Sequence, residues 1–254
     1  MLDNPEAFSG ATLILGAVLF SFQIYGDFSG YSDIAIGTAK LFGFELMTNF
    51  KFPYFSRDIA EFWRRWHISL STWFRDYLYI PLGGSRVSKP KAIRNVFVIF
   101  LVSGFWHGAN WTFIVWGGIH ALLFIPLFLR GTNRKNTTSI VAEGKWLPSP
   151  RELLQMGWTF TAVTIAWVFF RADNIGLASQ YLAQSAQGFE WPEGNKTTAL
   201  ASVAILLMVD WDLTRQKPLQ LSRYAKWPFA LILTIVTLSF LARSNQASFI
   251  YFQF

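Results

Sequence analysis

Long runs of apolar residues alternate along the chain with shorter polar stretches that carry most of its charge. A helix that crosses the hydrocarbon core of a bilayer needs about 20 mostly apolar residues, and fewer when it is broken or packed inside a bundle. Four runs fit this description, at residues 8–25, 158–170, 199–211 and 227–241. The pattern therefore predicts several membrane-spanning helices.

A longer apolar run, at residues 96–129, is interrupted near its middle by small and polar residues. The interruption contains Gly104, His107, Gly108 and Asn110. Because unsatisfied backbone groups are costly inside a membrane, a helix breaks there only where neighbouring protein covers the break. We therefore expect this run to form a helical hairpin or a broken helix.

Residues 56–80 have a different, amphipathic pattern. Ser56 is a good helix N-cap, and Asp58 and Glu61 follow in the first turns, where the helix dipole favours acids. At about 100° per residue, the seven charged side chains of the segment fall within an arc of roughly 120°. Most aromatic and aliphatic side chains, together with His67, occupy the other side. The segment therefore predicts one amphipathic helix that lies along the membrane interface or borders a polar cavity.

Two acids stand out near the end of the first apolar run. Asp27 and Asp33 lie close to Gly26 and Gly30 in the sequence. This setting allows either contact with a substrate or capping of helix ends, and we expect capping around the two glycines.

The composition agrees with a membrane protein. Of 254 residues, 52% are hydrophobic, 18% are aromatic and only 15% are charged, against roughly 25% charged in an ordinary soluble domain. A disordered chain or a nucleic-acid-binding tail shows the opposite balance. The sequence contains no cysteine, which excludes disulfides, thiolate metal sites and a cysteine nucleophile.

The net charge of +7 is explained by membrane topology, because short cytoplasmic loops carry an excess of Lys and Arg. Basic side chains flank the run at residues 96–129 on both sides: Arg86, Lys89, Lys91 and Arg94 precede it, and Arg130, Arg134, Lys135, Lys145 and Arg151 follow it. Both ends of the predicted hairpin are therefore expected on the cytoplasmic side. Attraction of substrate phosphates is a second role open to the first group.

The middle of the hairpin also holds the strongest candidate for chemistry, His107. Trp106, Trp111 and Trp116 flank it and are expected to exclude water around the imidazole. A neutral, oriented histidine in such a setting can act as a general base toward a substrate hydroxyl or thiol. The alternative is a helix-packing site in which His107 and Asn110 make interhelical hydrogen bonds.

The other two histidines carry weaker signals. His67 lies on the apolar arc of its predicted helix, where both a hydrogen-bonded core histidine and a functional one remain open. His120 follows Gly117 and Gly118 and is expected to be structural. The histidines are 40 and 13 residues apart and have no acid at ligand spacing, so no metal site is expected.

Three contiguous motifs carry a resemblance to a known family: GDFSGYSDIAIG at residues 26–37, NFKFPYFSRDIAEFWRRWHISLSTWFRDYLYIPLGGSR at residues 49–86, and GFWHGANWTFIVWG at residues 104–117. The chain resembles the membrane-bound O-acyltransferase family, and within it the bacterial branch of alginate O-acetylation. The resemblance implies an all-α, polytopic integral membrane protein with transmembrane, broken and interfacial amphipathic helices around a tunnel. Because family members are longer, it implies that residues 1–254 form a single membrane domain, the C-terminal part of that fold.

The resemblance also implies a function. The expected donor is acyl-coenzyme A, in particular acetyl-coenzyme A, with no tightly bound cofactor. His107 matches the catalytic histidine of the family and His67 the second histidine of the bacterial branch, while Asn110, Trp106 and Trp111 are expected to bind substrate. The expected acceptor is a polysaccharide such as alginate, reached directly or through a periplasmic partner acetyltransferase. We expect a multi-pass protein of the bacterial inner membrane that contacts membrane lipid and no nucleic acid.

Two other classes of protein remain open on the sequence alone. A transporter or channel for small solutes also uses intramembrane polar groups and broken helices. A third possibility is an inactive fragment that serves as a membrane scaffold for a partner acetyltransferase. Transfer of a labelled acetyl group separates the enzyme from both.

Overall fold

Within the residues that the structure describes, the chain is entirely helical. The structure is a computed structural model, and the described residues are 2, 4–188, 190, 192 and 196–214. The helices are η1 (Pro5–Ala7), α1 (Gly10–Leu41), η2 (Pro53–Phe55), α2 (Ile59–Arg65), α3 (Ile68–Phe74), η3 (Arg75–Tyr79), α4 (Lys89–His107), α5 (Trp111–Leu129), α6 (Pro150–Arg171), α7 (Ile175–Ser185) and α8 (Thr197–Thr214). The predicted all-α class is therefore confirmed.

Four of these helices, α1, α5, α6 and α8, are long and apolar enough to cross a membrane. The predicted runs at residues 158–170 and 199–211 lie inside α6 and α8. The run at residues 8–25 contributes to α1, and the run at residues 227–241 lies outside the described residues. The length and composition of the helices agree with a polytopic membrane protein.

The helix boundary predicted around Gly26 and Gly30 is wrong, because α1 continues through both glycines without a break. Asp27 and Asp33 therefore lie along the helix and cap neither of its ends. A glycine inside a helix costs only about 1 kcal/mol relative to alanine, so it is a weak stop signal. Packing of α1 against α6, α7 and α8 outweighs that cost.

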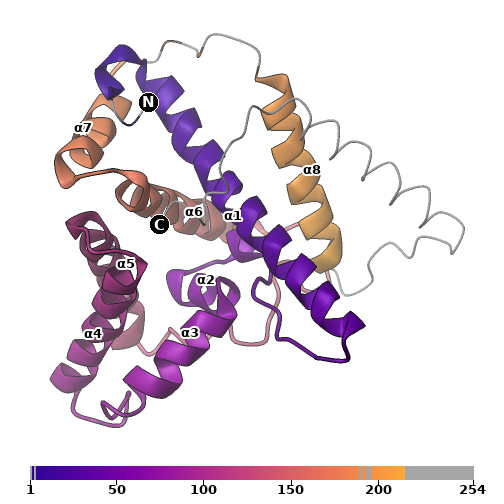
Figure 1. Ribbon diagram of the computed structural model, residues 1–254, viewed down its shortest axis with the longest axis vertical. Helices are drawn as coiled ribbons and strands as arrows, with labels where there is room; N and C mark the ends of the chain where they lie inside the picture. Colours follow the sequence, from indigo (N-terminus) through magenta and orange to yellow (C-terminus); the bar gives the residue numbers. More distant parts are fainter. Residues whose placement is uncertain (1, 3, 189, 191, 193–195, 215–254) are drawn as a thin grey trace, which may run out of the picture.

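The predicted hairpin at residues 96–129 is confirmed, since α4 and α5 lie side by side along their lengths (Figure 1). Gly104 of α4 and Gly117 of α5 each contact the backbone of the other helix, which only residues without a side chain allow. Asn110 starts the second helix, because its Oδ1 accepts a hydrogen bond from the Thr112 N–H. The small and polar residues thus mark the turn.

The single helix predicted at residues 56–80 is wrong. The segment is divided into α2, α3 and the π-helical turn η3. Between α2 and α3, Trp66 is extended and His67 takes left-handed backbone angles, with φ 45° and ψ 57°. The break turns the chain just before the histidine that the sequence singles out.

Backbone hydrogen bonds from a distant segment hold this break in place. The Ile68 N–H donates to the Asn49 carbonyl oxygen at 2.9 Å, and the Lys51 N–H donates to the Arg65 carbonyl oxygen at 3.0 Å. These bonds satisfy backbone groups that an uninterrupted helix would pair internally. The amphipathic pattern does not reveal them, since the partners are separated in sequence.

A core of aromatic side chains joins the helices, and α6 lies between α1 and the α4–α5 hairpin (Figure 1). Trp66, Trp116 and Trp167 are at most 4% exposed. Trp167 of α6 contacts both other rings, at 5.2 Å from Trp66 and 5.8 Å from Trp116 between centroids. Large flat rings in such contact fix the positions of α2, α5 and α6 relative to one another.

Candidate active site

His107, the last residue of α4, is surrounded by aromatic rings. Its imidazole packs edge-to-face on Trp116 of α5, with ring centroids 5.3 Å apart, and on Phe170 of α6 at 5.1 Å. Trp106 packs on a further side at 5.0 Å. These contacts come from three helices, and they fix the orientation of the ring.

His67 lies at the break between α2 and α3 and packs edge-to-face on Phe28 of α1, with ring centroids 4.6 Å apart. Burial, and to a smaller degree the nearby His107, lower the pKa of His67 to about 3. The ring is therefore neutral at physiological pH, and its unprotonated nitrogen can accept a hydrogen bond. The electrostatic effect of His107 on this pKa indicates that the two imidazoles lie near each other in the fold.

The three other predicted site residues are placed differently. Both ends of the Asn110 amide are engaged, since Oδ1 caps α5 and Nδ2 donates to the Asp173 carbonyl oxygen at 2.7 Å. Asn110 therefore ties the hairpin turn to the end of α6. Trp106 packs on His107 and is about half exposed, whereas Trp111 is 73% exposed at the start of α5. The structure thus places Trp106 against the imidazole and Trp111 on the surface.

A cavity of about 1190 Å³ lies between α2, α3, α4, α5 and the segment that follows α5. Its lining, within the described residues, contains basic, polar and apolar side chains and no acid. The basic residues of the lining are Lys51, Arg64, Arg65, Arg75 and Arg134. A basic cavity of this size suits a large anionic ligand, because guanidinium groups bind phosphates through charge-assisted hydrogen bonds.

Sequence reasoning missed part of this basic lining. Four basic residues that the sequence suggested for attracting substrate phosphates lie outside the lining: Arg86, Lys89, Lys91 and Arg94. Lys51 and Arg134 are 83 residues apart in the sequence, so only the fold brings them to one cavity. The available signal was the charged arc of residues 56–80, which contains Arg64 and Arg65.

The cavity approaches both histidines. Ser103 of α4 lines it and precedes His107 by four residues, so the two side chains share a face of the helix. Ile68 of α3 lines it and directly follows His67. A ligand held by the basic residues can therefore extend its other end toward the histidine pair.

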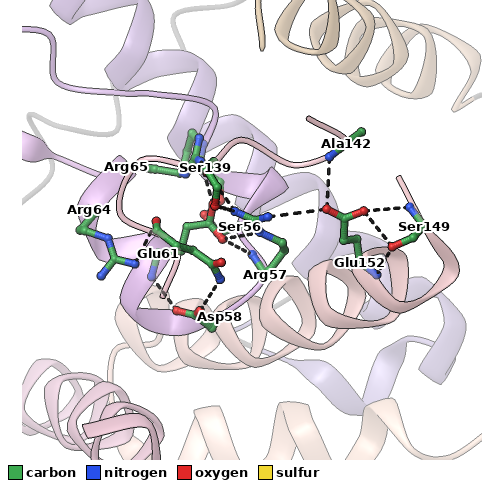
Figure 2. Close-up of polar contacts among 12 residues, drawn as sticks. Ser56, Arg57, Asp58, Glu61, Arg64, Arg65, Ser139, Ala142, Ser149 and Glu152 are labelled. Carbon is green, nitrogen blue, oxygen red and sulfur yellow. Dashed lines mark hydrogen bonds and ion pairs between the residues drawn. The ribbon is translucent and has the colours of Figure 1, made fainter. Parts of the chain in front are cut away.

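One wall of the cavity is the segment at residues 131–140, and side chains of α2 and its flank hold that segment (Figure 2). The fully buried Glu61 accepts hydrogen bonds from Arg57 and from Arg65, whose Nη2 lies 2.7 Å from Oε1. Both arginines also donate to the Ser139 carbonyl oxygen. Glu61 thus fixes the cations that fasten the wall.

Arg64 fastens the start of the same segment. Its Nη1 donates to the Asn133 carbonyl oxygen at 2.8 Å and its Nη2 to the Asn136 carbonyl oxygen at 3.3 Å. The Asn136 side chain in turn donates to Asp58 Oδ2 at 2.9 Å. One short helix, α2, therefore supplies cations to the cavity and also holds its wall.

The third histidine, His120, is fully buried in α5. Its Nδ1 accepts a hydrogen bond from Trp63 Nε1 at 3.3 Å, and its ring packs on Trp116 at 5.0 Å. Trp63 lines the cavity and Trp116 packs on His107, so His120 supports both. This is the structural position expected for it. In the described part of the chain, no group of three or more His, Asp or Glu side chains could hold a metal ion.

Comparisons with known proteins agree with the motifs. The family model described as MBOAT, membrane-bound O-acyltransferase family, matches residues 1–140. The chain is 46% identical over 192 residues to the "Probable alginate O-acetylase AlgI" of Pseudomonas fluorescens, an alignment that covers 75% of this chain and 35% of that protein.

Two further relatives extend this result. The protein of the same name from Pseudomonas aeruginosa is 48% identical over 179 residues, which cover 70% of this chain and 31% of that protein. The "Peptidoglycan O-acetyltransferase" of Helicobacter pylori is 35% identical over 279 residues, which cover 99% of this chain and 51% of that protein. The chain therefore spans about a third to a half of the length of the curated relatives it matches.

Proposed function

Because this chain belongs to the membrane-bound O-acyltransferase family, we propose that it takes part in transferring an acyl group from acyl-coenzyme A to a polysaccharide beyond the membrane. The observation that carries this proposal is a basic cavity without acids in its lining, to which Ile68, next to His67, and Ser103, one helical turn before His107, both contribute. The names of the relatives, an alginate O-acetylase and a peptidoglycan O-acetyltransferase, support acetyl as the group and a polymer such as alginate as the acceptor.

In the proposed reaction His107 is the general base. It withdraws the proton of the acceptor hydroxyl as the hydroxyl oxygen attacks the thioester carbonyl carbon. The tetrahedral intermediate collapses with cleavage of the carbon–sulfur bond, and the coenzyme A thiolate takes the proton from the imidazolium. The aromatic cage of His107 favours this role, because it orients the ring and limits access of water. His67 serves the same step by orienting the acceptor or by holding the thioester.

The basic cavity is the proposed donor site. Its five cationic side chains suit the phosphates of coenzyme A. The apolar part of the lining, which includes Phe74 and Phe100, suits the pantetheine arm. Ser103 also lines the cavity, on the face of α4 that carries His107, so the thioester end of the donor is expected near Ser103. No resident cofactor is needed for this chemistry, since the donor is a substrate.

The proposal also includes location and partners. We place the protein in the bacterial inner membrane as a multi-pass protein that contacts membrane lipid, which the four apolar helices support. The first residues of α4 and the loop after α5 are basic and lie at one end of the hairpin, and this favours the cytoplasmic side for the donor cavity. The acetyl group then passes to the polysaccharide, directly or through a periplasmic partner acetyltransferase.

The test is acetyl transfer by membranes that contain the protein at its natural length, supplied with labelled acetyl-coenzyme A. We expect His107→Ala to abolish incorporation into polymer while the amount of protein in the membrane stays unchanged. Gln23→Ala, an exposed position on α1, is the control and should retain full incorporation. Normal incorporation by His107→Ala would overturn the assignment. Solute uptake without acetyl transfer would favour a transporter. Acetyl transfer that requires the chain in the membrane but not its histidine would favour a scaffold.

A further inference from the structure

Asn49, in the extended segment between α1 and η2, makes hydrogen bonds to the first turn of α3. Its Oδ1 accepts from the Ser69 N–H at 3.1 Å and from the Ser69 hydroxyl at 2.7 Å. Its backbone carbonyl oxygen accepts from the Ile68 N–H. The first N–H groups of a helix need partners, and His67, at the N-cap position of α3, makes no side-chain cap bond. Asn49 therefore caps this helix from a distant part of the chain.

These contacts fix the direction of each hydrogen bond. A backbone N–H can only donate, so the Asn49 atom that faces Ser69 is the carbonyl oxygen Oδ1. The Ser69 hydroxyl, which faces the same oxygen, must therefore donate its single proton to Asn49. Asn49 Nδ2 donates in the other direction, to Ser32 Oγ of α1 at 3.2 Å. A flipped amide would place its NH2 group against the Ser69 N–H, so that N–H opposes the flip.

The direction of these bonds determines the tautomer of His67. Its Nδ1 lies 3.4 Å from Ser69 Oγ. Because the hydroxyl proton already points to Asn49, Ser69 can only accept from the ring, so the proton of the neutral imidazole is on Nδ1. The lone pair is then on Nε2. Fixing one ring nitrogen with a hydrogen bond in order to define the other is a general way of orienting a functional histidine.

We propose that Asn49 and Ser69 are positioning residues that hold His67 as an Nε2 hydrogen-bond acceptor. The tautomer follows from the hydrogen bonds alone, whereas its role in catalysis rests on the proposed function. An acceptor nitrogen can bind a hydroxyl of the acceptor substrate next to the one that His107 deprotonates, whereas it has no proton to donate to the carbonyl oxygen of a thioester. Of the two roles open to His67, the hydrogen-bond chain therefore selects orientation of the acceptor.

The same contacts explain how the unusual backbone of His67 is maintained. A residue with a side chain rarely takes left-handed angles, and it keeps them where surrounding bonds determine the conformation. Asn49 and Lys51 bond to the backbone on either side of His67, at Ile68 and Arg65. The Ser32 contact links this arrangement to α1, inside the motif at residues 26–37.

The experiment reads the tautomer directly, by NMR of the protein labelled with ¹⁵N-histidine in detergent micelles. A protonated and an unprotonated ring nitrogen differ strongly in chemical shift, and the chain has only three histidines to assign. We expect His67 to show a proton on Nδ1 in the wild-type protein and in Ser69→Thr. Ser69→Ala should lose this preference. Ser71→Ala is the matched control, because the Ser71 hydroxyl donates to the Trp66 carbonyl oxygen and should leave the ring unchanged.

A second pair of variants keeps the test valid if one protein fails to fold. Asn49→Asp retains an oxygen acceptor for Ser69 and should retain the tautomer, whereas Asn49→Leu should lose it. A His67 proton on Nε2 in the wild-type protein, or an unchanged His67 tautomer in Ser69→Ala, would overturn the inference, whatever the transfer activity. Absence of acetyl transfer with the expected tautomer would instead overturn the proposed function. In the transfer assay, Ser69→Ala should lose activity and Ser69→Thr should restore it.

Discussion

Gly117 of α5 lies so close to Phe100 of α4 that a Cβ atom at position 117 would collide with the Phe100 carbonyl oxygen. The next residue, Gly118, faces more open space, where an added Cβ atom would be 3.9 Å from the nearest neighbour, Leu101 Cδ2. The two neighbouring glycines therefore form a matched pair. The close contact between α4 and α5 requires Gly117 to lack a side chain, whereas a methyl group fits at Gly118.

We predict that Gly117→Ala separates the two helices and lowers stability by about 1–3 kcal/mol, the usual cost of overpacking. Gly118→Ala should be neutral or slightly stabilising, because alanine is the better helix former. Thermal unfolding of the two variants in the same detergent measures the difference. Equal unfolding midpoints would show that the backbone contact at Gly117 does not hold the hairpin.

The hairpin and the histidine at its turn could be predicted because their signals are local. Gly104, His107 and Asn110 interrupt an otherwise continuous apolar run, and the interruption coincides with the turn. Asn110 even has the side chain that starts the second helix. Where neighbouring residues in the sequence determine the structure, the pattern of residue types is sufficient.

The break at His67 could not be predicted, because the amphipathic pattern continues across it with no glycine or proline. The bonds that stabilise the break come from Asn49 and Lys51, which are distant in sequence. The basic cavity was missed for the same reason, since Lys51 and Arg134 meet only in the folded chain. Tertiary contacts, rather than local propensity, determine these features.

The basic lining of the cavity makes a kinetic prediction. Replacing Arg134 by glutamine removes one cation from the lining, and a hydrogen bond to a charged group is worth about 1.5–3 kcal/mol. We expect Arg134→Gln to raise the KM for acetyl-coenzyme A roughly tenfold or more with little change in kcat. Lys89→Gln, at the start of α4 and outside the lining, is the control. Equal effects of the two changes would argue against a donor site in the cavity.

A buried hydrogen bond joins α8 to α1, and its loss should be measurable. The Tyr25 hydroxyl donates to Asp210 Oδ2 at 2.7 Å, and both side chains are buried. Tyr25→Phe leaves the carboxyl group without this partner, at a cost of roughly 1–3 kcal/mol. We expect faster proteolysis in α8 and an earlier thermal transition. Tyr77→Phe, at a tyrosine that is 69% exposed, should change neither, and similar behaviour of the two variants would contradict the prediction.

Glu61 should control the cavity wall through its two arginines. It is fully buried and accepts hydrogen bonds from Arg57 and Arg65, and both arginines donate to the Ser139 carbonyl oxygen. Glu61→Gln removes the buried negative charge and leaves the cations without it, and breaking such a pair costs about 3–5 kcal/mol. We expect faster amide exchange across residues 133–142, measured by hydrogen–deuterium exchange, together with a higher KM for the donor.

The control for Glu61 is an equivalent change of acid to amide at an exposed ion pair. Asp76 pairs with its neighbour Arg75 at 2.7 Å, and both side chains are largely in contact with solvent. Exposed pairs contribute little, so Asp76→Asn should leave exchange in the wall unchanged. Should Glu61→Gln also leave it unchanged, Arg64 would have to hold the wall by itself, through its bonds to the carbonyl oxygens of Asn133 and Asn136. Arg64→Lys, which keeps the charge but loses the fork of donors, would then release the wall and separate the two explanations.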